Sequence, residues 1–180
     1  MGVTTALLTV EEYAQLPEEE TMLTELVEGQ IVRVSDAKFV HEQVKANTNK
    51  LLIVYVLQNP IGEVFSESMY KLGMREGRIP DVSLLLNERL AIQDRAGFLA
   101  GAPELAVEVV SSESAEFLER KVNLFLATGS RVVWVAYPRE RTLWIHRKDV
   151  HLQLREGQYV EEPDLLPGFR VLVDRFFDGI

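Results

Sequence analysis

Apolar and polar positions in the N-terminal half of the chain alternate with two different periods. Residues 22–35 alternate with the period of a strand on both sides of Glu28 and Gly29, which predicts a β-hairpin. Residues 40–58 have an apolar face with a helical period and are followed by Asn, Pro and Gly, which predicts a helix and its end. Residues 62–73 alternate again and predict one strand.

The C-terminal half contains a strand, a helix and a second strand in succession. We predict strands over 104–110 and 131–137 and a helix over 114–128 that ends at Gly129. This order is typical of a right-handed βαβ crossover, in which the two strands are parallel. Residues 142–162 alternate and predict antiparallel strands on the far side of the sheet.

Four segments have shorter or less regular patterns. Residues 9–16 predict a short helix with a Thr and Glu capping box, and 18–20 a solvated turn. Residues 87–103 predict a loop with one helical turn, which is either a flap over a functional site or a surface connector. Residues 164–180 predict a loop, a short strand and a helical turn whose phenylalanines pack on the core.

The predicted elements define an α/β fold of the mixed α+β kind. It has a central mixed β-sheet with a βαβ crossover, flanking helices and added antiparallel strands. The length of 180 residues and the hydrophobic content of 47% predict one domain over residues 1–180.

Composition limits the cellular setting of the protein. The chain has no cysteine, which excludes disulfides and thiolate metal sites. The apolar run LLIVYVL is too short to span a bilayer and the start of the chain has no basic leader, so we expect a cytoplasmic protein without a membrane partner. The opening MGVTTA loosely matches a myristoylation signal, a short match that often arises by chance.

Charge argues against a protein that coats nucleic acid. The net charge is −9, whereas phosphate binding normally uses clustered Lys and Arg. Any binding to DNA would therefore be weak, and it would depend on a metal ion that offsets part of the negative charge of the protein.

Three ionisable side chains lie where the pattern calls for apolar ones. Asp81 precedes the apolar run VSLLL, and Glu108 interrupts the buried-strand pattern ELAVEVV. Lys121 lies on the apolar face of the helix 114–128, where it either pairs with these carboxylates or extends to solvent. Two carboxylates at strand ends beside an ammonium suit a divalent cation and phosphodiester hydrolysis.

The segments IPDV, AVEVV and ERK, in this order, resemble the PD-(D/E)xK nuclease superfamily, and within it the Uma2 endonuclease family, also called DUF820. The resemblance extends from TELVEGQIV to DLLPGFRVLVDRFF. It implies a restriction endonuclease-like core. In the superfamily's usual motif the lysine lies two residues after the glutamate, where this chain has Val110, and Uma2-like chains supply it from the next helix, as Lys121 does here.

The resemblance implies a role for each site residue. Asp81, Glu108 and the carbonyl of Val109 would bind Mg²⁺ or Mn²⁺, and Lys121 would be the catalytic lysine. Glu25 matches the family's early glutamate and would complete the site. From the spacing alone, Glu25 is instead predicted to face outward from its strand.

The histidines have open interpretations. His41 opens the helix 40–58, where it is either a solvent-exposed or locally hydrogen-bonded side chain or a catalytic residue that the family resemblance supports. His146 and His151 are interpreted as half-exposed strand residues rather than a metal pair.

Arginines and tryptophans are given structural roles. Arg78, Arg89 and Arg95 lie near Asp81 in the sequence and could meet phosphates, but we interpret them as surface residues. Trp134 and Trp144 are interpreted as core or dimer contacts rather than as surfaces on which bases stack, because no cluster of basic residues accompanies them.

Three functions are compatible with these residues. The first is a metal-dependent DNA endonuclease in which the ion activates water, and a homodimer would match the two strands of a duplex. The second is an inactive interaction module on the same fold. The third is a small-molecule phosphodiesterase.

Overall fold

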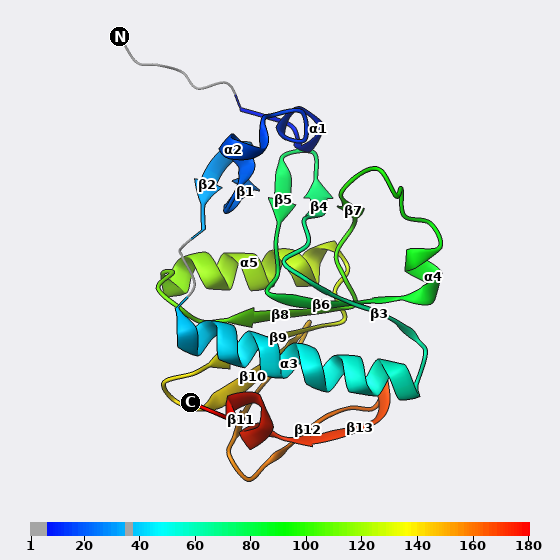
Figure 1. The fold of residues 1–180 in the computed structure, drawn as a ribbon, viewed down its shortest axis with the longest axis vertical. Helices are drawn as coiled ribbons and strands as arrows, with labels where there is room; N and C mark the ends of the chain where they lie inside the picture. Colours follow the sequence, from blue (N-terminus) through cyan, green and yellow to red (C-terminus); the bar gives the residue numbers. More distant parts are fainter. Residues whose placement is uncertain (1–6, 35–37) are drawn as a thin grey trace.

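The centre of the molecule is a six-stranded mixed sheet in the order β11-β10-β9-β8-β6-β3 (Figure 1). This computed structural model describes residues 7–34 and 38–180. β8 and β9 are parallel and joined by helix α5 (Ala115–Thr128), which confirms the predicted crossover, and the other neighbouring strands are antiparallel. The strands are β3 (Gly62–Ser66), β6 (Val82–Leu86), β8 (Leu105–Val109), β9 (Val132–Tyr137), β10 (Thr142–Arg147) and β11 (Val150–Arg155).

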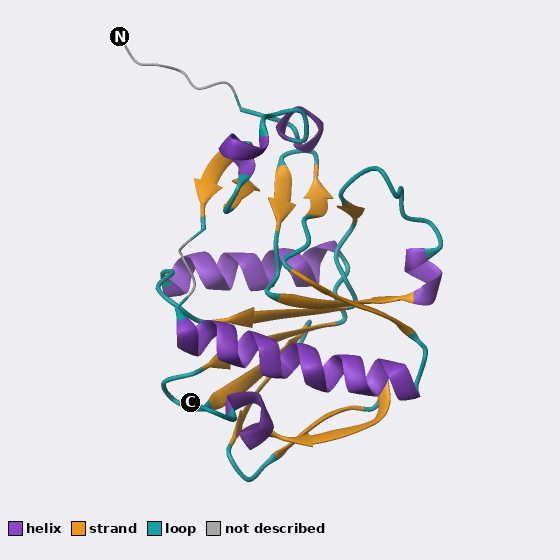
Figure 2. Cartoon of the chain, viewed as in Figure 1, coloured by secondary structure: helices purple, strands orange, loops and turns teal. Residues whose placement is uncertain are grey.

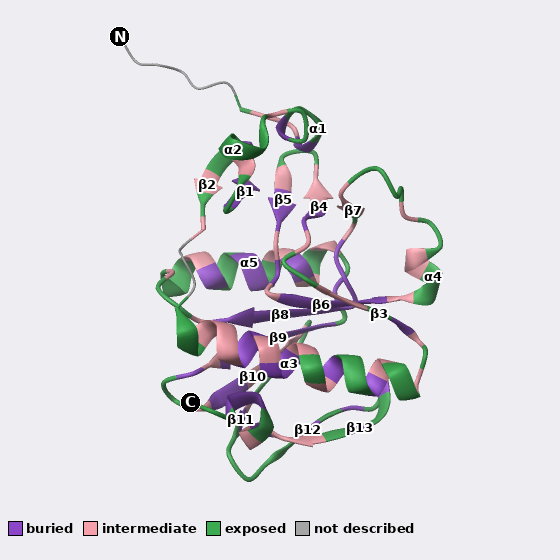
Figure 3. Ribbon diagram, in the orientation of Figure 1, coloured by how far each residue is buried: buried purple, intermediate pink, exposed green. Residues whose placement is uncertain are grey.

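Two long helices cover opposite faces of this sheet (Figures 1 and 2). On one face α5 packs through Leu118, Val122 and Phe125. On the other, α3 (Phe39–Gln58) packs through Val44 and Leu52. Because β8 and β9 are covered on both faces, almost all of their side chains are buried (Figure 3), as their continuous apolar sequences predict.

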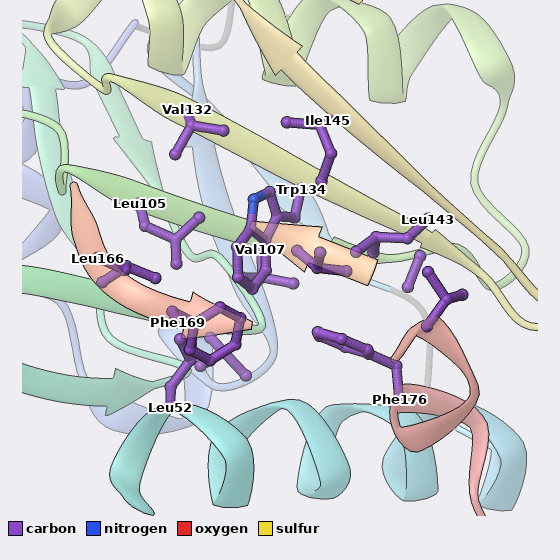
Figure 4. Close-up of a cluster of buried hydrophobic side chains, with 14 of the residues drawn as sticks. Leu52, Leu105, Val107, Val132, Trp134, Leu143, Ile145, Leu166, Phe169 and Phe176 are labelled. Atoms are coloured by element: carbon purple, nitrogen blue, oxygen red, sulfur yellow. The ribbon is translucent and has the colours of Figure 1, made fainter. Parts of the chain in front are cut away.

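The larger core lies between the sheet and α3 (Figure 4). Trp134 is fully buried there, with its ring centroid 5.7 Å from that of Phe169 and 5.8 Å from that of Phe176. Phe176 and Phe177 come from a C-terminal 3₁₀ helix, η1 (Val173–Phe177), and both are fully buried, which confirms their predicted packing on the core.

A second, five-stranded sheet has the order β2-β1-β5-β4-β7. Its hairpin turns at Glu28 and Gly29, as predicted, and both residues have positive φ. The prediction of one strand over 62–73 is wrong, because β3 and β4 belong to different sheets and the chain turns between them at Glu67, where φ is 49°. The strands are β1 (Thr24–Val27), β2 (Gln30–Arg33), β4 (Tyr70–Gly73), β5 (Glu76–Arg78) and β7 (Leu99–Ala100).

Two smaller predictions need correction. Residues 18–20 belong to a short exposed helix, α2 (Glu18–Thr21), rather than a turn. The end of the alternating segment 142–162 leaves the main sheet, because β12 (Tyr159–Glu162) pairs with β13 (Leu166–Leu172) in a separate two-stranded sheet.

The N-terminal capping box is confirmed, with reciprocal hydrogen bonds between Thr9 and Glu12 at the start of α1 (Val10–Tyr13). The MGVTTA segment lies outside the described residues. Among the residues that the structure describes, no helix is long and apolar enough to cross a membrane.

Candidate active site

The candidate site lies where the chain passes from one sheet to the other. β5 ends at Arg78 in the five-stranded sheet, and β6 begins at Val82 in the six-stranded sheet. Asp81 is therefore the last residue before β6, whose Val82 pairs with Val107 of β8. The Asp81 Oδ2 atom accepts a hydrogen bond of 2.6 Å from the Val109 backbone N–H. This hydrogen bond continues the pairing of β6 with β8 by one residue before the start of β6, and it holds the Asp81 carboxylate at the end of β8.

Glu108 lies on the α5 face of the sheet. Successive side chains of a strand point to opposite faces, so Val107 and Val109 face the core under α3, whereas Glu108 shares its face with Ala106, which packs against α5. Glu108 is 5% exposed. Its position opposite α5 is what brings it to Lys121.

Lys121 is buried and fully paired, so the alternative in which it reaches solvent is wrong. Its residue is 7% exposed, and its Nζ atom donates to Glu108 Oε2 at 3.0 Å and to the Ile79 carbonyl oxygen at 2.8 Å. The same Nζ lies 2.8 Å from Glu25 Oε1. A charged side chain can be buried on the apolar face of α5 because these three oxygen acceptors surround its ammonium group.

Glu25 is fully buried, which overturns the prediction from spacing that it faces outward. Its Oε1 atom also accepts a 2.8 Å hydrogen bond from the Ile79 backbone N–H. Its Oε2 atom lies 3.4 Å from a guanidinium nitrogen of Arg78. Glu25 therefore joins β1 and the β5–β6 connection to Lys121 on α5.

His41 contacts Asp81 from the start of α3. Its Nε2 atom lies 3.2 Å from Asp81 Oδ1, and its side chain is 11% exposed. Its Nδ1 atom is 3.3 Å from Glu42, whose carboxylate is 2.6 Å from the ammonium of Lys45. Lys45 also binds Glu67 at 2.8 Å, so a chain of polar contacts fixes the side of Asp81 that faces away from β8.

Burial and charge shift the pKa values of three site residues. Burial raises the pKa of Glu108 well above its usual value, although the nearby Lys121 ammonium opposes this. Burial alone would lower the pKa of Lys121, but the carboxylates of Glu108 and Glu25 raise it overall. Burial likewise lowers the pKa of His41, and the hydrogen bond and charge of Asp81 outweigh this effect and raise it. The carboxylates around Lys121 therefore favour its charged form.

A cavity of about 380 Å³ opens onto these groups. β8 runs toward the side of the molecule where α3 begins (Figure 1), which is why Val109 and His41 meet at the same cavity. The lining comes from the β1–β2 hairpin and the residue before it, the start of α3, the β5–β6 connection, the end of β8, the loop after β8, and α5. It includes Asp81, Glu108, Val109, Lys121, His41, Leu23, Val32, Arg33, Ile79 and Phe117.

The oxygen atoms present fit a hard divalent cation. Glu108 Oε1 is buried and has no hydrogen-bond partner within residues 7–34 and 38–180. Asp81 and Val109 line the same cavity at this end of β8, and carboxylate and backbone carbonyl oxygens are ligands that suit Mg²⁺. Within the described ranges, no three His, Asp or Glu side chains are grouped to hold a metal ion, so a site here would consist of two carboxylates completed by backbone and water.

The predicted arginine roles are only partly correct. Arg78 is 5% exposed and contacts Glu25 and Glu76, so it is not a surface residue. Arg89 is half-buried and lies 3.7 Å from Glu104, and Arg95 is exposed. None of the three lines the cavity.

Residues 87–103 do not form a flap over the cavity. They contain α4 (Asn87–Leu90) and β7, and they follow the end of β6 opposite to Asp81 (Figure 1). No residue of this segment lines the cavity, so the alternative reading as a connector is correct.

His146 and His151 lie opposite each other on β10 and β11, as the strand interpretation predicts, with His146 half-buried and His151 exposed. Their Nδ1 atoms are 2.9 Å apart, and the ring of Trp144 stacks on His146. Neither histidine lines the cavity.

The sequence did not single out Lys45, Glu67, Arg33 or Phe117 as parts of the site or its surroundings. Lys45 lies four residues after His41 on α3, so a helical wheel places both on one face. Phe117 lies four residues before Lys121 on α5 by the same spacing. The i, i+4 relation to a candidate residue is the signal that could have identified both.

The fold is that of a known class of protein. It resembles a solved structure from Anabaena variabilis described as "a putative nuclease belonging to DUF820", with a TM-score of 0.81 and 21% sequence identity. The match covers 94% of this chain and 97% of that chain, and it shows the mixed α+β fold.

The family follows from the sequence of almost the whole chain. The family model Uma2, described as "putative restriction endonuclease", matches residues 10–174, so the chain belongs to the Uma2 family. This description indicates a nuclease, and restriction endonuclease-like families generally use divalent metal ions.

A curated relative is an uncharacterized protein from Synechocystis sp., which is 29% identical over 117 residues. The match spans 63% of this chain and 64% of that relative, less than two thirds of its length.

Proposed function

We propose that this protein is a metal-dependent endonuclease that hydrolyses phosphodiester bonds in DNA. One observation carries the proposal: two carboxylates, Asp81 and Glu108, and the ammonium of Lys121 line one cavity. The Oε1 atom of Glu108 is buried and has no hydrogen-bond partner among the described residues, so it is available to bind a cation at the cavity. Membership of a family described as restriction endonuclease supports the substrate class.

The residues divide the chemical work. Asp81, Glu108 and the Val109 carbonyl would hold Mg²⁺ or Mn²⁺, which when bound supplies Lewis-acid polarisation of the phosphate and a lowered pKa for water. Lys121 would stabilise the negative charge that develops on the phosphoryl oxygens, because a preorganised ammonium in a site of limited water acts strongly.

The remaining groups position these side chains. Glu25 holds the Lys121 Nζ at 2.8 Å. His41 at 3.2 Å and the Val109 N–H at 2.6 Å hold the two oxygens of Asp81. Such supporting contacts fix the geometry on which metal affinity and rate depend.

Cleavage of labelled DNA with Mg²⁺ or Mn²⁺ tests the proposal. Asp81→Asn and Lys121→Ala should each abolish metal-stimulated cutting, whereas Asp149→Asn, in the exposed β10–β11 turn, should not. Thermal unfolding of each variant checks that it is folded. Unchanged cutting by folded Asp81→Asn protein would remove the assignment.

The expected homodimer stays a prediction. The chain has a mass of 20.5 kDa, so light scattering should give twice this value if two copies associate. A mass equal to that of one chain contradicts the expectation.

A further inference from the structure

The cavity beside the carboxylates has an apolar wall. Leu23, Val32, Ile79 and Phe117 line it, together with Leu118. Its volume of about 380 Å³ is near the lower end of the range for small-molecule sites, roughly 300–1,000 Å³. The space next to the ionic groups is therefore suited to one planar group with apolar faces, such as a single nucleobase.

The charges around the cavity do not favour a continuous duplex. Its lining carries four carboxylates, from Glu67, Asp81, Glu108 and Glu113, against the guanidinium of Arg33 and the ammonium of Lys121. Lys121 is already paired with carboxylates. Duplex DNA is bound mainly by clusters of Lys and Arg along its phosphates, and the described lining has no such cluster. Affinity for a nucleic acid must therefore come from contacts other than those of Lys and Arg with phosphates.

Phe117 offers such a contact because an unpaired base can stack on an aromatic ring. The guanidinium of buried Arg78 lies 5.6 Å from the Phe117 ring centroid, so the ring is held from the protein side while it lines the cavity. Phe117 precedes Lys121 by one helical turn on the same face of α5. A base that contacts Phe117 would therefore have its phosphate beside Lys121.

Leu23 extends the apolar wall to the surface. It is 46% exposed, lines the cavity and has a φ of 56°, a left-handed conformation that is unfavourable for leucine. Residues held in strained backbone conformations cluster at functional sites. Leu23 is placed where it can contact a base that has left its stack.

We propose that the substrate of this site presents an unpaired nucleotide, as in single-stranded DNA or a single-stranded segment of a duplex. Its base enters the cavity against Phe117 and Leu23, and its phosphate meets Asp81, Glu108 and Lys121. This inference rests on the proposed nuclease function and adds the substrate class to it.

The first test compares one labelled strand in three forms: alone, in a blunt duplex, and in a duplex with a central unpaired segment. With Mn²⁺, kcat/KM for the single strand and the unpaired segment should exceed that for the blunt duplex by about tenfold or more, since each stacked base contributes that much binding. Equal cutting of the blunt duplex overturns the substrate class alone. No metal-dependent cutting of any form overturns the proposed function, and with it this inference.

The second test removes the base or its partner. An abasic position beside the scissile bond should raise KM about tenfold in the native protein and have little further effect in Phe117→Ala, because both changes remove one stacking contact. Phe117→Tyr should restore the effect of the base. A full abasic effect in Phe117→Ala, or none in the native protein, contradicts the proposed base contact.

Matched leucines complete the design. Leu23→Ala should raise KM for single strands, whereas Leu57→Ala should not, since Leu57 is 79% exposed near the end of α3 and does not line the cavity. Circular dichroism melts verify the fold of each variant. Equal KM values for the two folded variants would overturn the role of Leu23.

Discussion

Removing the buried ammonium of Lys121 should lower the stability of the fold by an amount that can be measured without any substrate. Lys121→Met keeps the apolar stem of the side chain but removes the donor. Glu25, Glu108 and the Ile79 carbonyl, at 2.8, 3.0 and 2.8 Å, then lose their common partner. Removing one member of a buried ion pair costs about 3–5 kcal/mol, so the free energy of unfolding should fall by about this amount at neutral pH in chelator.

The neighbouring residue provides the control. Arg120 is 69% exposed at its side chain and pairs with Glu116 one turn away at 2.6 Å, a surface pair of about 0.3–0.5 kcal/mol. Arg120→Met removes the same charge, so effects of net charge cancel between the two variants. Urea unfolding followed by the fluorescence of buried Trp134 and half-buried Trp144 measures the free energy of unfolding of both variants.

A double variant separates loss of the donor from general damage to the core. With Glu108→Gln added to Lys121→Met, an amide replaces a buried carboxyl group that has lost its partner, and part of the lost stability should return. The reasoning is refuted if Lys121→Met loses no more stability than Arg120→Met.

Other contacts give further expected outcomes. His41→Ala removes a donor to Asp81 and should reduce DNA cleavage about 10–100-fold, whereas His146→Ala, away from the cavity, should leave it unchanged; equal rates for the two variants contradict this. Trp134→Phe removes the 3.0 Å hydrogen bond to Glu162 Oε1 and should lower the free energy of unfolding by about 1–3 kcal/mol, measured by circular dichroism in urea; an unchanged midpoint argues against that bond. Gly129→Ala should cost about 1–2 kcal/mol through the φ of 127° alone, because an added Cβ meets no atom within 4 Å; an unchanged melting temperature contradicts this conformation.

The sequence was most informative where charge interrupted a strong apolar pattern. Glu108 and Lys121 are each 5–7% exposed, and a buried charge requires a partner, so their pairing could be predicted without coordinates. The βαβ order then placed α5 over β8 and gave the direction of approach. The crossover and the helix end at Gly129 were predictable for the same reason, since both depend on local signals.

Glu25 shows what local patterns cannot give. Alternation along β1 states that neighbouring side chains face opposite ways, but it does not say which face is covered by another layer. Here the covered face meets Lys121 and Arg78, which come from distant segments. The division of residues 62–73 between two sheets was missed likewise, because strand alternation continues across the turn at Glu67.

The contacts of His41 and Phe117 depended on tertiary structure in the same way. Their helices could be predicted, but the meeting of α3 and α5 at one cavity follows from the direction of β8 and the position of the hairpin. Sequence spacing gave the faces of these helices without the distance between them.

The position of a bound divalent ion tests the central claim most directly. Crystals soaked in Mn²⁺ and measured at a wavelength where manganese scatters anomalously would locate it. The account predicts a peak within bonding distance of the carboxylate oxygens of Asp81 and Glu108, with the Lys121 ammonium close by. A well-occupied peak elsewhere, such as at His146 and His151, with none between Asp81 and Glu108, would contradict it.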